Sequence, residues 1–222
     1  MNIIVCGDSH TRVFSYCNKH QEQFKFNVCE VGGATAQGAV NPNSKTNALG
    51  IFSTKLKNAP KADKVLIMLG EVDCGFVIWV RSKRYNISVD EQLQTSIDNL
   101  FRFIETRVLS CGYLPRDIII TGVILPTIKD NTNKKYLQGA RSEVDVDQYT
   151  RTQKTLEYND MLKTRCNDYG YHYIDITTNI MDDNGLINDY YLSENHTDHH
   201  LSNPKTYGFW INKIQLCYTS DA

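Results

Sequence analysis

Residues 2–10 read NIIVCGDSH, and this stretch decides how the rest of the chain is interpreted. An apolar run of strand length leads within four residues to a glycine, an acid, a hydroxyl and an imidazole. A glycine at the end of a strand permits a sharp turn that a side chain would obstruct. Ser9 then falls where the next helix begins, and backbone N–H groups there lack intrahelical partners. The stretch predicts a buried strand whose end carries side chains capable of chemistry.

Four further apolar runs follow at intervals long enough for a helix. Continuous apolar runs, rather than alternating ones, are typical of strands buried on both faces of a parallel sheet. The five predicted strands are residues 2–6, 26–29, 65–69, 117–121 and 171–174. Strands that alternate with helices imply a βαβ architecture. In such sheets, ligands collect outside the carboxyl ends of the strands.

Three helices have recognisable boundaries. Ser88 and Glu91 form a capping-box pattern that opens an amphipathic segment, and Gly112 would end it. Two more helices are predicted over residues 150–169 and 205–216.

Two polar segments between the predicted elements are long enough to be loops. Residues 126–149 are lysine-rich and are expected to form an extended loop over the site. Residues 38–50 form the second loop.

Composition excludes several classes of function. The 222 residues contain no internal repeat, which favours a single domain over residues 1–222. Hydrophobic residues make up 41% and charged residues 22%, as in ordinary soluble globular proteins. The net charge of −1 gives no electrostatic reason to bind nucleic acid or an anionic membrane, and no apolar stretch is long enough to cross a bilayer.

The cysteines and the first residues bear on location. The seven cysteines are scattered and form no CxxC pair, so neither a disulfide framework nor a zinc knuckle is indicated. No charged leader or small-residue cleavage site precedes the first apolar run. We therefore expect free thiols and a cytoplasmic protein.

Two more predicted strands end in unusual groups. Gly32 and Gly33 follow the second strand and would let the backbone approach a ligand. The third strand ends in the range 70–73, GEVD, whose carboxylates could equally be helix-start acids on a solvated face. Ser9 could likewise be a helix cap. It also suits a nucleophile whose own N–H binds a developing oxyanion.

The last group lies in residues 195–202, NHTDHHLS, just before the third predicted helix. Three of the six histidines of the chain fall within five residues, beside an acid. A serine nucleophile needs a base, and the base needs a partner that fixes its tautomer. This segment supplies both an imidazole and a carboxylate.

Taken in order, the four groups resemble the SGNH/GDSL hydrolase superfamily. Its pattern is a Gly-Asp-Ser block, a glycine block, a Gly-x-Asn-Asp block and a late Asp-x-x-His block. Ser9 completes the first block, Gly33 stands for the second, residues 70–73 occupy the third, and His200 with Leu201 after it matches the last. The resemblance spans nearly the whole chain. It implies a three-layer α/β/α sandwich with a flavodoxin-like parallel sheet.

The sequence departs from the family pattern twice. Val72 stands where the family has asparagine, whose side chain is the third oxyanion donor. Losing one such donor can cost roughly 2.7–4 kcal/mol of transition-state stabilisation. The family's acid lies three residues before its histidine, whereas Asp198 lies two before His200. Counting back three residues gives Thr197 from His200 and His196 from His199, and neither is an acid. Asp198 is the only carboxylate close by, so it is the acid we expect.

The resemblance implies a serine esterase or acyltransferase that uses neither a metal nor a cofactor. His200 would take the proton of Ser9, Asp198 would orient the imidazole, and the N–H groups of Ser9 and Gly33 would bind the oxyanion. His199 is expected to turn away from Ser9. The acyl-enzyme would pass its acyl group to water or to a sugar hydroxyl. The preferred substrate is a small molecule or glycan that carries a short acyl ester such as acetate, with no nucleic-acid or membrane partner.

Several other residues are expected near the substrate. We predict that Ser9, Gly33, Gly70 and His200 converge at the carboxyl edge of the sheet. The missing donor could be replaced by backbone in the turn of residues 71–74 or by one further side chain; the candidates for that side chain are Thr35, Arg81 and Arg151. The remaining candidate substrate-site residues are Asp8, His10, Glu71, Asp73 and His199, again with Arg151.

Two other functions remain open. Asp8 and His10 also match the Asp-x-His that opens metallophosphoesterase sites, and the late histidines could add ligands. That family's Gly-Asp-x-x-Asp and Gly-Asn-His blocks are missing. The other alternative is a degenerate SGNH fold that binds a glycan or a protein partner, because Val72 replaces the asparagine.

Overall fold

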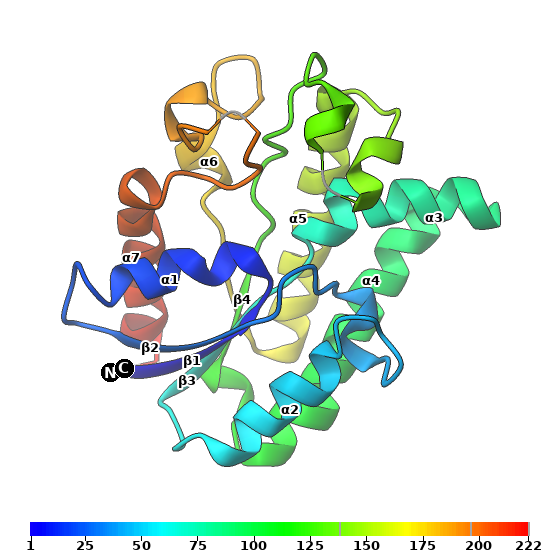
Figure 1. Cartoon of the computed structure of the whole chain (residues 1–222). Coiled ribbons are helices and arrows are strands. Elements are labelled where there is room, and N and C mark those ends of the chain that lie inside the picture. The colour runs from blue at the N-terminus through cyan, green and yellow to red at the C-terminus, as the bar shows by residue number, and fades with distance from the viewer. Residues whose placement is uncertain (138, 196, 222) are drawn as a thin grey trace.

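Five parallel strands form one sheet in the computed structural model, which describes residues 1–137, 139–195 and 197–221 (Figure 1). The sheet has the order β2-β1-β3-β4-β5, and every neighbouring pair is parallel. This is the flavodoxin-like order. The strands are β1 Asn2–Gly7, β2 Lys25–Glu30, β3 Lys64–Met68, β4 Ile118–Thr121 and β5 His172–Ile174. All five predicted strands are confirmed, with ends that differ by one residue at most.

Helices cover both faces of this sheet. The helices are α1 Arg12–Cys17, α2 Ala48–Asn58, α3 Ile78–Tyr85, α4 Val89–Phe103, α5 Gln148–Tyr169, α6 Thr177–Ile180 and α7 Asn203–Ser220. One hydrophobic cluster joins a sheet face to α2, α4 and α5, and a second cluster joins the opposite face to α1, α6 and α7. The three-layer α/β/α fold expected from the sequence is confirmed.

The continuous apolar runs follow from this layering. Along β1, Ile4 and Cys6 belong to the first cluster, while Ile3 and Val5 belong to the second. Successive side chains of a strand point to opposite faces, so a strand covered on both sides needs apolar residues throughout. Burying both faces of β1 also fixes the position of its carboxyl end, from which Ser9 follows.

The helix boundaries agree with the local chemistry. The Ser88 side chain accepts from the Glu91 N–H, and the Glu91 carboxylate accepts from the Ser88 N–H, so the predicted capping box is present. Gly112 and Gly170 both have positive φ, 88° and 74°, where the predicted helices end. α5 begins before the predicted residue 150, because Asp147 caps it by accepting from the Thr150 N–H at 2.7 Å.

The two predicted loops contain some helical structure. Within residues 126–149, short 3-10 turns form at Lys134–Tyr136 and Gly139–Glu143. The polar segment 38–50 gives its last three residues to α2. In the part of the chain that the structure describes, no helix combines the length and the apolar character that a bilayer crossing requires.

Candidate active site

Ser9 is presented by a tight turn after β1. A Cβ on Gly7 would collide with the carbonyl oxygen of Met68 on the adjacent strand, so this position needs glycine. Asp8 then accepts from the His10 N–H at 2.9 Å and caps the 3-10 turn Ser9–Thr11. The turn places Ser9 at the carboxyl edge of the sheet, half-buried.

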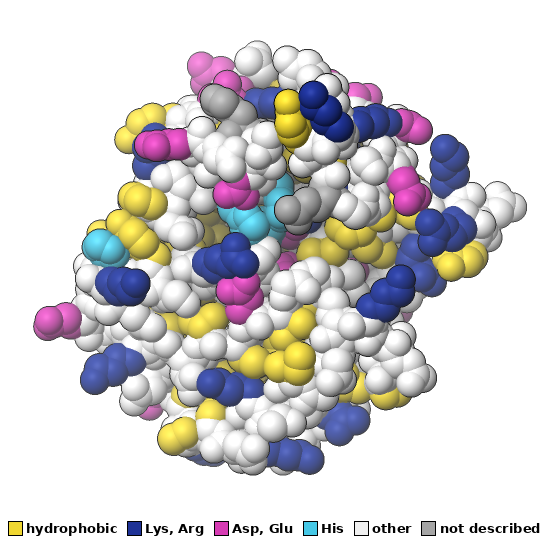
Figure 2. Space-filling model, viewed as in Figure 1, with side chains coloured by type: hydrophobic (Ala, Val, Ile, Leu, Met, Phe, Trp, Pro, Cys, Tyr) yellow, Lys and Arg dark blue, Asp and Glu magenta, His cyan; other side chains and the backbone are white. Residues whose placement is uncertain are grey.

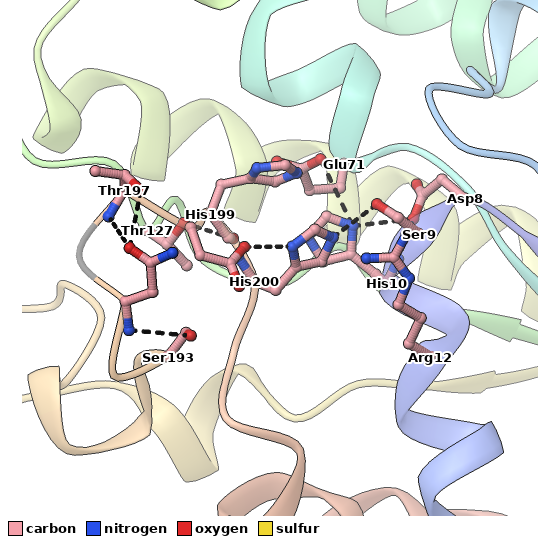
Figure 3. Close-up of polar contacts among 12 residues, drawn as sticks. Asp8, Ser9, His10, Arg12, Glu71, Thr127, Ser193, Thr197, His199 and His200 are labelled. Atoms are coloured by element: carbon pink, nitrogen blue, oxygen red, sulfur yellow. Dashed lines mark hydrogen bonds and ion pairs between the residues drawn. The ribbon is translucent and has the colours of Figure 1, made fainter. Parts of the chain in front are cut away.

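His200 and Asp198 reach Ser9 from the segment before α7. Ser9 Oγ lies 2.7 Å from His200 Nε2, and His200 Nδ1 lies 2.5 Å from Asp198 Oδ1 (Figure 3). The same Asp198 oxygen accepts from the His200 N–H at 3.0 Å. This local turn explains how an acid only two residues before the histidine can still reach its ring. Ser9, His200 and Asp198 therefore form an unbroken hydrogen-bonded series.

His199 lies beside His200 and does not turn away, so this expectation is wrong. The two ring centroids are 4.1 Å apart, and both rings line the same cavity as Ser9. Thr127 Oγ1 donates to the His199 carbonyl at 2.7 Å and ties this segment to the chain after β4. His196, which the family spacing would pair with His199, lies outside the described residues.

A cavity of about 740 Å³ opens over Ser9. Figure 2 shows a group of histidine side chains in a hollow near the centre of the molecular face seen in Figure 1, and further histidine atoms at the left edge. Gly33 and Val72 line this cavity together with Ser9. The segments that follow β1, β2 and β3 thus meet here, whereas Gly70 packs against Val123 and Tyr158 and is not part of the cavity lining. An adjoining cavity of about 600 Å³ also touches Ser9 and His200, and its apolar lining includes Val13, Met68, Ile124, Leu201 and Trp210.

Asp73 lies behind the glycine loop rather than in the cavity. Its carboxylate is fully buried and accepts from the Ala36 N–H at 2.7 Å, the Gln37 N–H at 3.1 Å and the Ser96 hydroxyl at 2.9 Å. Burial raises the pKa of this carboxyl group. The structure therefore gives Asp73 a role in holding the loop that carries Gly33.

His10 packs against the two late histidines. Its ring centroid lies 4.5 Å from that of His200 and 5.4 Å from that of His199. Its Nδ1 lies 2.9 Å from Asp8 Oδ1 and 3.7 Å from Glu71 Oε2. Burial alone would lower the pKa of His10, but these two carboxylates outweigh it and raise that pKa.

Glu71 forms a buried, bidentate ion pair with Arg141. The two bonds measure 2.8 and 3.1 Å, and the side chains are 14% and 9% exposed. Burial would raise the pKa of Glu71, but Arg141 and then His10 lower it well below its usual range. Arg141 comes from the loop of residues 126–149 and lines the cavity of Ser9. That loop therefore lies over the site, as predicted.

Arg81 and Arg151, the two arginines predicted near the substrate, are not part of the lining of this cavity. Arg151 donates to the Val146 and Ile128 carbonyls at 3.0 and 2.8 Å, which fixes the loop, and it lines a neighbouring cavity. Arg81 lies over the Tyr85 ring, 4.9 Å from its centroid. Arg141 was missed because nothing in the local sequence sets it apart from the other basic residues of the chain.

The surroundings of His200 favour its neutral form. Burial, with His10 nearby, lowers the pKa of His200, although Asp198 opposes the change. Burial lowers the pKa of His199 to about 4, and Arg141 adds to that effect. Burial would raise the pKa of Asp198, but its bonds to His200 lower it. A neutral imidazole that faces a hydroxyl and is backed by a carboxylate can accept a proton.

Comparison with known proteins gives one kind of match. No protein-family model matches the chain, and neither does any curated protein sequence. Among solved structures, a carbohydrate acetylesterase family member from Sinorhizobium meliloti has a TM-score of 0.62 at 12% identity, over 97% of this chain and 98% of that one. An acetyl xylan esterase has a TM-score of 0.56 at 11% identity, over 97% and 98%.

A GDSL-like lipase from Bacteroides thetaiotaomicron has a TM-score of 0.59 at 12% identity, over 99% of this chain and 88% of that one. These identities are low, so the likeness concerns the fold. The sheet order and the layers agree with it. The chain has the fold of the SGNH/GDSL hydrolase superfamily.

Proposed function

We propose that the chain is a serine-dependent carboxylic ester hydrolase or acyltransferase. The observation that carries this proposal is the series from Ser9 Oγ to His200 Nε2 at 2.7 Å and from His200 Nδ1 to Asp198 at 2.5 Å, at the base of a cavity. A serine becomes a nucleophile when an adjacent base takes its proton and a third group orients that base.

Each residue of the site has its own role in the proposed reaction. His200 takes the proton as Ser9 Oγ attacks the ester carbonyl, and Asp198 stabilises the imidazolium. The backbone N–H groups of Ser9 and Gly33 bind the oxyanion. His200 then returns the proton to the leaving alcohol. His200 then takes a proton from water, or from a sugar hydroxyl, as that group attacks the acyl-enzyme. It returns this proton to Ser9 Oγ as the acyl group leaves the serine.

The donor missing at Val72 is replaced from nearby. Thr35 and Arg81 line another cavity, so neither is the donor. The Cys74 N–H already donates a hydrogen bond to the Gly70 carbonyl at 2.9 Å. Arg141 lines the cavity of Ser9. We assign the additional stabilisation of the oxyanion to the first N–H groups of the helical turn that begins at residue 71, because the charge of Arg141 is balanced by its ion pair with Glu71.

The substrate class is a short acyl ester, preferably an acetate on a carbohydrate. Two solved structures of this fold bear the names of an acetyl xylan esterase and a carbohydrate acetylesterase. The lining of the cavity over Ser9 includes Arg12, Asn195, Thr197 and Arg141, polar groups that can bind a hydroxylated alcohol part.

The seven free thiols support the predicted cytoplasmic location.

A serine-directed phosphonylating probe tests the proposal. The probe should label the wild-type protein on the peptide that contains Ser9, and Ser9→Ala should abolish both labelling and hydrolysis of 4-nitrophenyl acetate. Ser15→Ala, which removes an exposed serine of α1, is the matched control and should retain both. Hydrolysis that survives Ser9→Ala would refute the proposal.

A substrate series then separates hydrolysis from transfer. Acetylated xylo-oligosaccharides and 4-nitrophenyl esters of increasing acyl length should be cleaved fastest as acetates. If free sugar added to the reaction becomes acetylated faster than acetate is released, the chain is a transferase.

A further inference from the structure

Three imidazoles from distant parts of the sequence meet at one point. His10, His199 and His200 each offer a ring nitrogen, and these nitrogens lie within 4.8 Å of one another. Figure 3 shows His10 following Ser9 on one side and the two late histidines approaching it from the other segment. The proposed ester chemistry uses only one of the three rings, so the other two need an explanation.

Two of the rings have the same carboxylate support. His10 Nδ1 lies 2.9 Å from Asp8 Oδ1, and His200 Nδ1 lies 2.5 Å from Asp198 Oδ1. A carboxylate that holds Nδ1–H fixes the tautomer and leaves Nε2 as the nitrogen with a lone pair. This is the arrangement in which histidine binds metal ions in proteins.

The Nε2 atom of His10 supplies an independent observation. This nitrogen is buried and has no hydrogen-bond partner among the described residues, and the His10 side chain is only 6% exposed. A buried polar atom left without a hydrogen-bond partner is energetically unfavourable. A ligand that accepts its lone pair would remove that cost.

We propose that His10, His199 and His200 form a binding site for a divalent transition metal, with zinc as the favoured ion, and that metal bound there blocks Ser9. Three imidazole nitrogens, each of which must be deprotonated to bind the metal, and one open position suit the tetrahedral preference of zinc. At Zn–N distances of about 2.0–2.1 Å the nitrogens would lie about 3.4 Å apart, so small ring rotations close the site. Magnesium and calcium prefer oxygen ligands and do not fit.

The metal and the nucleophile compete for one atom. His200 Nε2 is the nitrogen that lies 2.7 Å from Ser9 Oγ. Once its lone pair is donated to a metal it cannot take the proton of Ser9, so hydrolysis stops. The binding site stands on geometry alone, whereas the inhibitory effect rests on the proposed ester chemistry.

Binding is tested directly on Ser9→Ala protein, which keeps all three histidines and removes the competing hydroxyl. Calorimetric titration with zinc chloride at pH 8 should give one site per chain, and magnesium chloride should give none. His10→Ala and His199→Ala, each added to Ser9→Ala, should abolish that site. Asp8→Asn should weaken it about 10- to 100-fold, the usual effect of losing the carboxylate behind a ligating histidine.

A matched control is His172→Ala. His172 also pairs with a carboxylate, Asp221 at 3.2 Å, but it lies on β5 away from the cluster. Its replacement should leave the zinc affinity and the number of zinc ions bound unchanged. Cobalt(II) gives a second measurement on folded Ser9→Ala protein. It should show the intense visible bands of a tetrahedral site without a thiolate charge-transfer band. Zinc binding that survives both histidine variants, no binding, or a thiolate band would overturn the site.

Inhibition is tested on the wild-type protein. Zinc should suppress hydrolysis of 4-nitrophenyl acetate, EDTA should restore it, and His199→Ala should shift half-inhibition to at least about tenfold more zinc, relative to its own metal-free rate. If zinc binds to the site but leaves hydrolysis unchanged or increases it, the inhibitory role is wrong. Hydrolysis by Ser9→Ala would instead refute the proposed function and leave the metal site standing.

Discussion

Asp8-Ser9-His10 and Asp198-His199-His200 are two copies of one local arrangement at opposite ends of the chain. In each, the aspartate accepts from the backbone N–H of the histidine two residues later, at 2.9 and 3.0 Å, and the same oxygen holds Nδ1 of that histidine. The two rings then lie 4.5 Å apart, centroid to centroid. The sequence spacing and the hydrogen bonds are the same in both.

The surroundings of the two rings differ. His200 Nε2 faces the hydroxyl of Ser9, and its ring borders the open cavity. His10 has a second carboxylate nearby, Glu71 at 3.7 Å, and its Nε2 is buried. The pKa of His10 is raised, whereas that of His200 is lowered. An Asp-x-His motif therefore does not specify a base, since the group that faces Nε2 decides the role.

The largest expected effect separates the two histidines. His200→Ala should lower kcat/KM for 4-nitrophenyl acetate by about 10⁶-fold, the scale seen when a serine hydrolase loses its base. His10→Ala should cost far less, because its Nε2 does not contact Ser9. Steady-state kinetics on both variants, with circular dichroism to check folding, measures the difference. Equal losses would show that the two motifs act as one unit.

The next effect separates the two aspartates. Asp198→Asn should lower kcat by about 10⁴-fold with little change in KM, because asparagine favours the wrong tautomer of His200. Asp8→Asn should reduce kcat much less, since asparagine can still cap the turn that presents Ser9. Kinetics at a single pH on this matched pair is sufficient. A larger loss in Asp8→Asn would mean that His10, not His200, is the base.

A third effect concerns Glu71, which has no counterpart beside His200. Its ion pair with Arg141 is mostly buried, so removing one partner leaves an uncompensated charge. Glu71→Gln and Arg141→Met should each lower the free energy of unfolding by about 3–5 kcal/mol. The double variant should lose less than the sum of the two, which urea unfolding of all four proteins measures. Additive losses would indicate that the interaction between the two side chains does not contribute to the free energy of unfolding.

The sequence predicted the sheet well, because strands covered on both faces carry continuous apolar runs that are visible in one chain. It also placed Ser9 and Gly33 at strand ends, where parallel topology brings them together, and His200 in the segment before the last helix. It gave no bounds for α1, which it expected only as a helix after Ser9, and none for α2, α3 or α6. α1 has only six residues, and α2 follows Asn47, which has a φ of 52° and makes no side-chain cap bond.

Long-range pairing explains the remaining misses. Asp73 looked like a site acid because it follows Glu71 closely, yet its partners are Ala36, Gln37 and Ser96. Arg141 reaches Glu71 across 70 positions in sequence. Such contacts depend on how a loop folds over the sheet edge, and no local pattern encodes them.

The smallest expected effect concerns Val72, the neighbour of the Glu71 carboxylate that distinguishes the surroundings of His10 from those of His200. Val72 directly follows Glu71, is buried and lines the cavity of Ser9, so Val72→Asn would place a neutral donor there. We expect kcat to stay the same or to rise less than about tenfold, because the backbone N–H groups of the turn already supply the oxyanion donors in the proposed mechanism. An absent donor would be worth about 10²–10³ in kcat. A rise of that size in Val72→Asn, measured with 4-nitrophenyl acetate and absent from a Val72→Leu control, would show that the natural chain lacks this donor. The site would then be one that holds an ester far better than it cleaves it, and glycan binding would replace catalysis as its function.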